Sequence, residues 1–368
     1  MKIPLANPVF DEEMKEAALD ALQNERSVSG NSVHKFEEEF ARYHGVRRAV
    51  SVSSGTAALQ LSLIALGLKN GDEVVTTPAS FVATSNAILH ANGSPVFVDI
   101  DLGTYNMDPN CFEKSLTDKT RATIPVHLYG YPAEMKAINE IAQERDIFVV
   151  EDACQAHGAE YMGKKVGTLG KVGCFSFYPS KCMTVCGDGG AVVTDDEEVA
   201  NLIAKLRDCG RASQYLHDRI GFTARLNTVN AAIGRVQLRR LDSWNQNRRS
   251  RAALYDKLLH EVGDVVTPPK ANDHVSPVYH LYVIRTRYRD SLKDWLDKTG
   301  IQCGVHYPVP IHLQPVYREL FGFKGGEFPN SELLSQTALS LPIYPSMKDE
   351  DVKFVCEEIR AFFSMKGF

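Results

Sequence analysis

Residues 147–159 read IFVVEDACQAHGA, an apolar run rich in β-branched residues that ends in two acidic residues and then in small ones. A short unbroken apolar run is typical of a strand that is buried on both faces of a parallel sheet. Ligands of open α/β sheets bind at the carboxyl ends of such strands, where Asp152 stands. The stretch therefore predicts an α/β fold with Asp152 in a ligand site, although an aspartate that caps the next segment is equally compatible.

The alternation of short β-rich runs and helical patterns extends on both sides of this stretch, from about residue 49 to residue 205. Such alternation is typical of βαβ units around a mainly parallel sheet. The spacing of apolar residues along the sequence distinguishes the helices from the strands. We expect strands at 49–52, 73–76, 95–99, 122–126, 147–151, 173–177 and 191–194, and helices at 56–66, 82–91, 134–145 and 197–207.

The pattern changes after residue 230, where a helical stretch dense in arginine and leucine runs from 231 to 259. A proline-rich loop at 267–270 follows, and then a strand at 280–285, a helix near 291–299, a loop rich in proline and histidine, and a terminal helix at 349–363. We therefore predict a large ligand-binding domain at residues 1–245, with an N-terminal arm, and a smaller α+β domain at residues 246–368.

The composition excludes several functional classes. The 368 residues carry 41 basic and 46 acidic side chains, a formal charge of −5, with no concentrated basic block. No apolar run approaches the ~18 residues of a membrane-spanning helix, and the first residues lack the apolar core of a signal peptide. We expect a cytoplasmic protein that binds small anionic ligands rather than nucleic acid or membranes.

Eight cysteines without a secretory leader indicate reduced thiols rather than a disulfide framework. Cys182 and Cys186, with Cys174 nearby, leave a metal or iron–sulfur site as an alternative. No C-x-x-C pair or neighbouring histidine supports that alternative. We expect these cysteines to be buried and to pack as small hydrophobic residues do, and we expect no metal.

Two further motifs complete a chemical pattern with Asp152. Residues 53–59 read SSGTAAL, a strand end that turns into a helix, where free N–H groups and hydroxyls favour a phosphate group; an ordinary helix cap is the alternative. Lys181 lies in a turn among aromatic and small residues, and a desolvated lysine becomes a usable amine nucleophile. Pyridoxal 5'-phosphate (PLP) needs these three groups: an anion site, a carboxylate for the ring nitrogen and an amine.

With these motifs in order, the chain resembles the sugar-nucleotide aminotransferase (DegT/StrS) family of fold-type-I PLP-dependent enzymes, almost from end to end. The resemblance implies a large domain with a mainly parallel sheet and a smaller α+β domain. The segments that carry it are G-x-x-V-x-x-F-E at 30–37, SSGTAAL at 53–59, PVHLYG at 125–130, EDACQAHGA at 151–159, FSFYP-x-K at 175–181, RLN at 225–227 and AAIG at 231–234.

The resemblance assigns a role to each cofactor residue. Lys181 would form the Schiff base, Asp152 would pair with the pyridinium nitrogen, and these two are the catalytic residues. Thr56 and Ala57, with Ser176, would hold the phosphate, and Gln155 would lie near the phenolic oxygen. Phe81, which an apolar core explains equally well, would stack on the ring. The full predicted set is Gly55, Thr56, Ala57, Phe81, Asp152, Gln155, Ser176, Lys181 and Asn227.

Asn227 matches the family residue that reaches the phosphate from the partner subunit, so the resemblance implies a homodimer with shared active sites. It also implies amino transfer from glutamate to a nucleotide-diphosphate-linked keto sugar. Lys181 stands where the dehydratases of the family carry histidine. The residues 187–190 (GDGG) and 306–315 are similar to the branch that acts on 3-keto sugars.

His306, Tyr307 and His312 are candidates for the sugar entrance, and a structural proline-rich loop is the alternative for all three. Two alternatives stay open for the function. The chain is an aminotransferase for a 4-keto sugar nucleotide or a keto-cyclitol, or it is a PLP-binding regulatory protein without turnover.

Overall fold

A seven-stranded sheet lies at the centre of the computed structural model, which describes residues 2–368. The strand β9 is antiparallel to both of its neighbours, and the other neighbouring pairs in this sheet are parallel. The predicted α/β fold with a mainly parallel sheet is confirmed. In spatial order the strands are β1 (Arg48–Val52), β9 (Gly190–Thr194), β8 (Val172–Ser176), β5 (Phe148–Asp152), β4 (Thr120–Thr123), β2 (Glu73–Thr76) and β3 (Ser94–Phe97).

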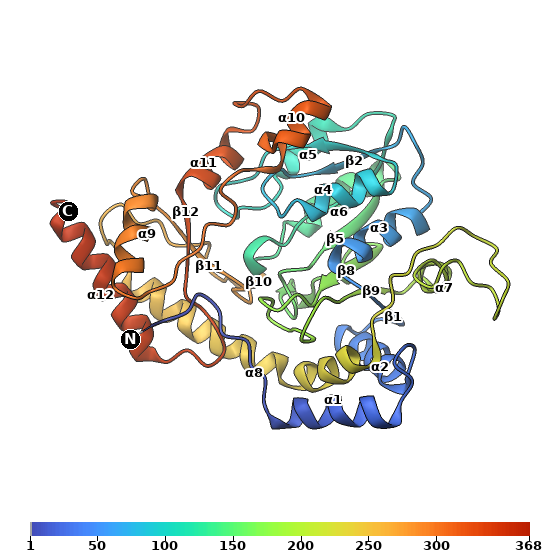
Figure 1. The fold of residues 1–368 in the computed structure, drawn as a ribbon. Coiled ribbons are helices and arrows are strands. Elements are labelled where there is room, and N and C mark those ends of the chain that lie inside the picture. Colours follow the sequence, from blue (N-terminus) through green and yellow to red (C-terminus); the bar gives the residue numbers. More distant parts are fainter. Residues whose placement is uncertain (1) are drawn as a thin grey trace.

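Helices cover both faces of this sheet (Figure 1). Because both faces are covered, the strand β5 is apolar along its length: Val149 and Val150 are buried in opposite core clusters. One layer contains α3 (Gly55–Ala65), α4 (Ala83–His90) and α7 (Glu197–Leu206). The other layer contains α2 (Asn31–His44), α5 (Pro109–Ser115), α6 (Met135–Glu144) and the first half of α8 (Thr228–Leu258).

The helix α8 is 31 residues long and connects two hydrophobic cores. Leu238 and Leu241 belong to the core of the large sheet, whereas Ala252 and Tyr255 belong to the core of the C-terminal unit. The helix is continuous through residue 245, where we place the domain division. That division stays a prediction.

The C-terminal unit is built around a two-stranded antiparallel sheet, and Ile3 of the N-terminal segment packs into its core. The backbone of Ile3 also bonds to Gly300 and Gln302. The elements are β11 (Tyr282–Arg285), α9 (Arg289–Lys298), α10 (Pro315–Phe321), α11 (Pro329–Thr337), β12 (Ala338–Leu341) and α12 (Asp349–Met365). A separate small sheet contains β10 (Val275–Ser276), β6 (Glu160–Tyr161) and β7 (Lys164–Lys165).

The predicted elements between residues 49 and 207 are all present, with ends shifted by a few residues. The sequence analysis missed the two N-terminal helices, α1 (Glu12–Asn24) and α2, the short helices α5, α10 and α11, the strand β12, and the three short strands of the small sheet. The helix α1 buries only Met14 and Ala21, so its apolar stripe is too narrow for a clear periodic pattern. No helix within residues 2–368 is both long and apolar enough to cross a membrane.

Two buried histidines lie in a cluster of phenylalanines between α2 and the sheet. The ring of His44 is 4.4 Å from that of Phe40, and the ring of His157 is 5.4 Å from that of Phe175, measured between centroids. Burial lowers the pKa of His44 from 6.5 to about 4 and that of His157 to about 3. Both rings are therefore neutral in the folded protein at neutral pH.

These histidines predict a loss of stability in mild acid. Below pH 6.5 the unfolded chain binds protons that the folded protein excludes, so stability falls as the pH decreases from 6.5 towards 4. Each histidine accounts for about 2 kcal/mol of lost stability by pH 5. Urea unfolding between pH 7 and pH 5 measures this loss. The variant His157→Leu should show a loss smaller by about 2 kcal/mol, whereas His260→Leu, at an exposed site, should behave like the parent; a pH-independent parent would contradict the prediction.

Candidate active site

Asp152 is the last residue of β5, and its carboxylate is held by two hydrogen bonds. Thr84 Oγ1 donates to Oδ2 over 2.8 Å, and the Cys154 N–H donates to Oδ1 over 3.2 Å. The side chain is buried, with 5% of its surface exposed. The structure therefore places Asp152 at the carboxyl end of a central parallel strand, where ligands bind in α/β sheets.

The neighbouring residue Glu151 fixes the end of this strand from the opposite face. Its carboxylate is fully buried and accepts hydrogen bonds from the N–H groups of Gly167, Leu169 and Gly170, over 2.5 to 2.7 Å. A fourth bond, of 3.0 Å, comes from His127 Nε2. Because His127 Nδ1 accepts the Ala133 N–H, the ring carries its proton on Nε2 and donates to Glu151.

The helix α3 begins directly beside these strand ends. Ser54 caps the helix and accepts the Ala57 N–H over 3.1 Å, and the N–H groups of Gly55 and Thr56 have no partner within residues 2–368. A Cβ atom at Gly55 would lie 2.8 Å from both Cys154 Sγ and Ser176 Cβ. Only glycine therefore lets the helix start approach the ends of β5 and β8 this closely. The result is a helix N-terminus close to Asp152, an arrangement that suits an anion.

Lys181 lies in the turn that follows β8, and its backbone N–H bonds to the Tyr178 carbonyl over 2.9 Å. Burial lowers the pKa of its amine, and the nearby Cys154 and Asp152 oppose that shift. A desolvated amine is more easily deprotonated, and the neutral form is the nucleophile.

Gln155 connects this group to the C-terminal unit. Its Oε1 accepts the Tyr129 N–H over 2.9 Å, and its Nε2 donates to Tyr307 Oη over 3.3 Å. Tyr129 also donates its hydroxyl to the His306 carbonyl. The segment of residues 306–307 is thus bonded to the large sheet at two points. Burial lowers the pKa of His306 to about 4, and the charge of Lys181 acts in the same direction.

The structure brings most of the predicted residues together, but not all of them. Phe81 is half exposed, and its ring is 5.8 Å from that of Tyr307. Asn227 is exposed and caps α8 through a bond to the Asn230 N–H. His312 does not join the group: its ring is fully buried against Phe328, and Nε2 bonds to Glu332 over 3.0 Å.

The sequence analysis missed Thr84 and Tyr129, which bond directly to predicted site residues. Tyr129 lies within the PVHLYG segment, so it was visible as part of a motif but not as a partner of Gln155. The eight cysteines are free thiols; Cys174 and Cys182 are buried, whereas Cys186 is exposed.

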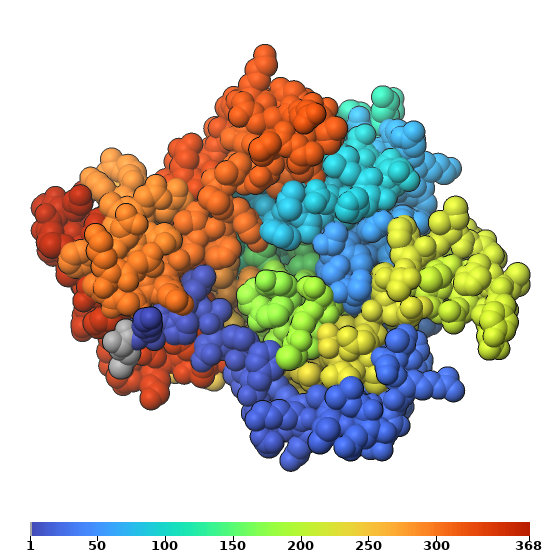
Figure 2. All heavy atoms as spheres, in the orientation of Figure 1, coloured from blue at the N-terminus to red at the C-terminus, as the bar shows by residue number. Residues whose placement is uncertain are grey.

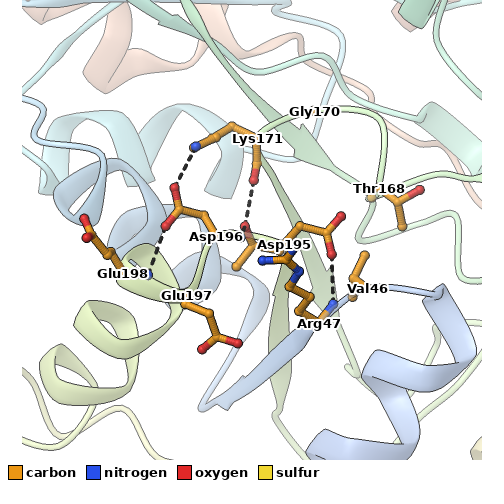
Figure 3. Close-up of a pocket in the computed structure, with 11 residues that line it drawn as sticks. Val46, Arg47, Thr168, Gly170, Lys171, Asp195, Asp196, Glu197 and Glu198 are labelled. Carbon is orange, nitrogen blue, oxygen red and sulfur yellow. Dashed lines mark hydrogen bonds and ion pairs between the residues drawn. The ribbon is translucent and has the colours of Figure 1, made fainter.

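Surfaces from the N-terminal, central and C-terminal parts of the chain meet around a hollow in the centre of the face shown in Figure 2. A separate hollow of about 490 Å³ is lined by the segment before β8 and the segment after β9 (Figure 3). The strands of the sheet have Asp152 at one end, and this hollow lies at their other end. Two of its charged side chains are paired with each other, Lys171 and Asp196 over 2.7 Å, and Asp195 accepts the backbone N–H of Arg47.

The residues beside Asp152 fit PLP. The two free N–H groups at the start of α3 suit its phosphate, the buried carboxylate of Asp152 suits a protonated ring nitrogen, and the desolvated amine of Lys181 suits its aldehyde. These three groups come from separate segments, and the close approach at Gly55 joins two of them.

A family model for the DegT/DnrJ/EryC1/StrS aminotransferase family matches residues 8–360 of the chain. The chain therefore belongs to this family of PLP-dependent sugar aminotransferases.

Among its relatives, a "Pleiotropic regulatory protein" of Geobacillus stearothermophilus is 42% identical over 94% of this chain and 92% of that protein. The dTDP-3-amino-3,4,6-trideoxy-alpha-D-glucose transaminase of Streptomyces venezuelae is 41% identical over 92% and 89%. The solved structure of S. venezuelae DesV in complex with a ketimine intermediate superposes with a TM-score of 0.94, at 38% identity and 98% coverage of both chains.

The hydrogen bonds of Glu151 predict that a conservative substitution at this position strongly lowers the free energy of unfolding. In Glu151→Gln the amide nitrogen faces backbone N–H donors, so one or more buried donors lose their acceptor. We expect a loss of about 3 kcal/mol in the free energy of unfolding. Urea unfolding followed by circular dichroism measures it. Glu160→Gln, which removes a half-exposed pair with Lys165, serves as the control and should cost less than 1 kcal/mol; equal costs for the two variants would refute the role of Glu151.

Proposed function

We propose that this chain transfers an amino group from glutamate to a nucleotide-diphosphate-linked 3-keto sugar. The single observation that carries the proposal is the partly buried Lys181, whose amine has a pKa lowered by burial and opposed by the charge of Asp152, within a chain of the aminotransferase family. The 41% identity with a transaminase named for a 3-amino sugar nucleotide supports the choice of carbon 3. The GDGG segment at 187–190 supports it as well.

When bound, PLP supplies a conjugated ring that accepts the electron pair released at the α-carbon of the amino donor. The residues of the chain would do the rest. Lys181 would bind the cofactor covalently through Nζ. With its amine free, Lys181 would accept the proton of the donor α-carbon on Nζ, and its lowered pKa suits this role as a general base. Asp152 would keep the proton on the ring nitrogen.

The other predicted residues would bind and orient the cofactor. Gly55, Thr56 and Ala57 at the start of α3, with Ser176 at the end of β8, would hold the phosphate. Gln155 would lie near the phenolic oxygen. Phe81 would stack on the ring, and its half-exposed side chain leaves a face free for this contact.

We further propose a homodimer in which Asn227 reaches the phosphate of the partner subunit. The segment between α7 and α8 supports it, because it exposes Tyr215, Leu216 and Ile220 at 87%, 61% and 93%. Large exposed apolar groups that lie close together in the chain mark interaction surfaces. His306 and Tyr307, which bond to the large sheet through Tyr129 and Gln155, would border the sugar.

The relative named as a regulatory protein raises a second function, PLP binding without turnover. The lysine and the carboxylate that amino transfer needs are both present here, and they favour turnover. The alternatives at carbon 4, or on a keto-cyclitol, use the same residues around PLP and differ only in the substrate.

Lys181→Ala tests the central residue. We expect complete loss of amino transfer and of the visible absorption band of bound PLP, because no other amine of the site takes its place. Absorption spectra before and after addition of glutamate measure the band and its shift. Lys171→Ala, which removes a surface lysine paired with Asp196, is the matched control and should keep both. Retention of the band and of turnover in Lys181→Ala would overturn the assignment, and a parent band that glutamate leaves unchanged would favour a silent binder or another donor.

The choice of substrate is tested with a panel of nucleotide-linked 3-keto and 4-keto deoxysugars and keto-cyclitols. We expect an amino product from the 3-keto sugars and glutamate, in which the mass spectrum shows the keto oxygen replaced by one nitrogen and three hydrogens. Conversion at least tenfold faster for a 4-keto sugar or a cyclitol would refute the choice of carbon 3 and leave the PLP site in place.

A further inference from the structure

Two hydroxyl groups form a chain behind Asp152. Ser80 Oγ lies 2.7 Å from Thr84 Oγ1, which lies 2.8 Å from Asp152 Oδ2. All three side chains are buried, with 3%, 1% and 5% of their surfaces exposed. Ser80 lies in the segment that connects β2 to α4, and Thr84 lies in the first turn of α4. Asp152 ends β5, 68 residues after Thr84.

The chemistry of the groups fixes the direction of these hydrogen bonds. An ionised carboxylate only accepts, so Thr84 must give its single hydroxyl proton to Asp152. The oxygen of Thr84 is then left as an acceptor, and Ser80 donates to it. Bonds from a hydroxyl to a charged group are stronger than those between neutral groups, and they hold the plane of the carboxylate.

The side chain and the backbone of Thr84 both restrict the orientation of its hydroxyl donor. Threonine has few rotamers because its Cβ is branched, and the backbone N–H of Thr84 bonds to the Phe81 carbonyl over 3.1 Å. Phe81 stands between the two hydroxyls in the chain. Phe81 is expected on the face of the PLP ring, and Asp152 is expected at the ring nitrogen. Phe81 and the hydroxyl groups that hold Asp152 therefore lie within the same five residues, 80–84.

We propose that Thr84, supported by Ser80, is a positioning residue that aims the Asp152 carboxylate at the ring nitrogen of PLP. The inference deepens the proposed function and rests on its assignment of Asp152. Each oxygen of that carboxylate has a second acceptor site besides those used by Thr84 and Cys154, so a bond to the ring N–H adds to this geometry without displacing it.

Thr84→Val removes the hydroxyl and keeps the shape of the side chain. We expect the dissociation constant of PLP from the full chain to rise about tenfold or more, since a hydrogen bond to a charged group is lost. Fluorescence titration of the PLP-free protein measures it. Thr84→Ser restores a hydroxyl and should return the constant to within about threefold of the parent.

Three controls separate positioning from a general loss of structure. Ser85→Ala removes a buried hydroxyl of the same helix that does not bond to Asp152, and should leave PLP binding unchanged. A PLP analogue with carbon in place of the ring nitrogen should bind Thr84→Val and the parent equally well. In the Asp152→Asn background, Thr84→Val should change PLP binding less than twofold.

The outcomes are distinct. If Asp152→Asn leaves PLP binding unchanged, the assignment of Asp152 fails, and this proposal fails with it. If Asp152→Asn weakens binding but a folded Thr84→Val does not, only the role of Thr84 is refuted. An equal effect of Thr84→Val on PLP and on the nitrogen-free analogue, or no rescue by Thr84→Ser, would also refute it.

Discussion

The buried carboxylate of Glu151 is the interaction on which the site depends. It gathers three backbone N–H groups from residues 167–170 and the ring of His127, so the segments before β8 and after β4 are tied to the end of β5. A buried charge is tolerated only when its acceptor sites are filled, and here four donors fill them. Side chains alternate along a strand, so fixing Glu151 on one side directs Asp152 to the other.

Around this fixed strand end, backbone segments lie close enough together to form the site without long side chains. Gly55 lets the start of α3 meet Cys154 and Ser176, and a larger residue would push the helix away from both. The C-terminal unit contributes through His306 and Tyr307, which accept hydrogen bonds from the Tyr129 hydroxyl and the Gln155 amide of the large domain. One set of hydrogen bonds thus joins Gln155 of the large domain to the segment of residues 306–307.

The sequence located those residues whose position follows from a local pattern. The position of Asp152 could be predicted because an apolar strand ends there. The start of α3 beside it could be predicted because Gly55 follows another apolar strand and precedes a helical pattern. Thr84 could not, because its bond to Asp152 depends on the order of β2, β4 and β5 in the sheet. His312 was predicted near the sugar entrance by its neighbours in the chain. The Ile311 N–H bonds to the Pro78 carbonyl, and the next side chain turns into an aromatic cluster instead.

The continuous helix α8 has a mechanical consequence. At 1.5 Å per residue its 31 residues form a rod about 46 Å long, with one half seated in each hydrophobic core. A large rotation of the C-terminal unit would have to break backbone bonds in the middle of this rod, near residue 245. The rod therefore keeps the two cores at a fixed separation.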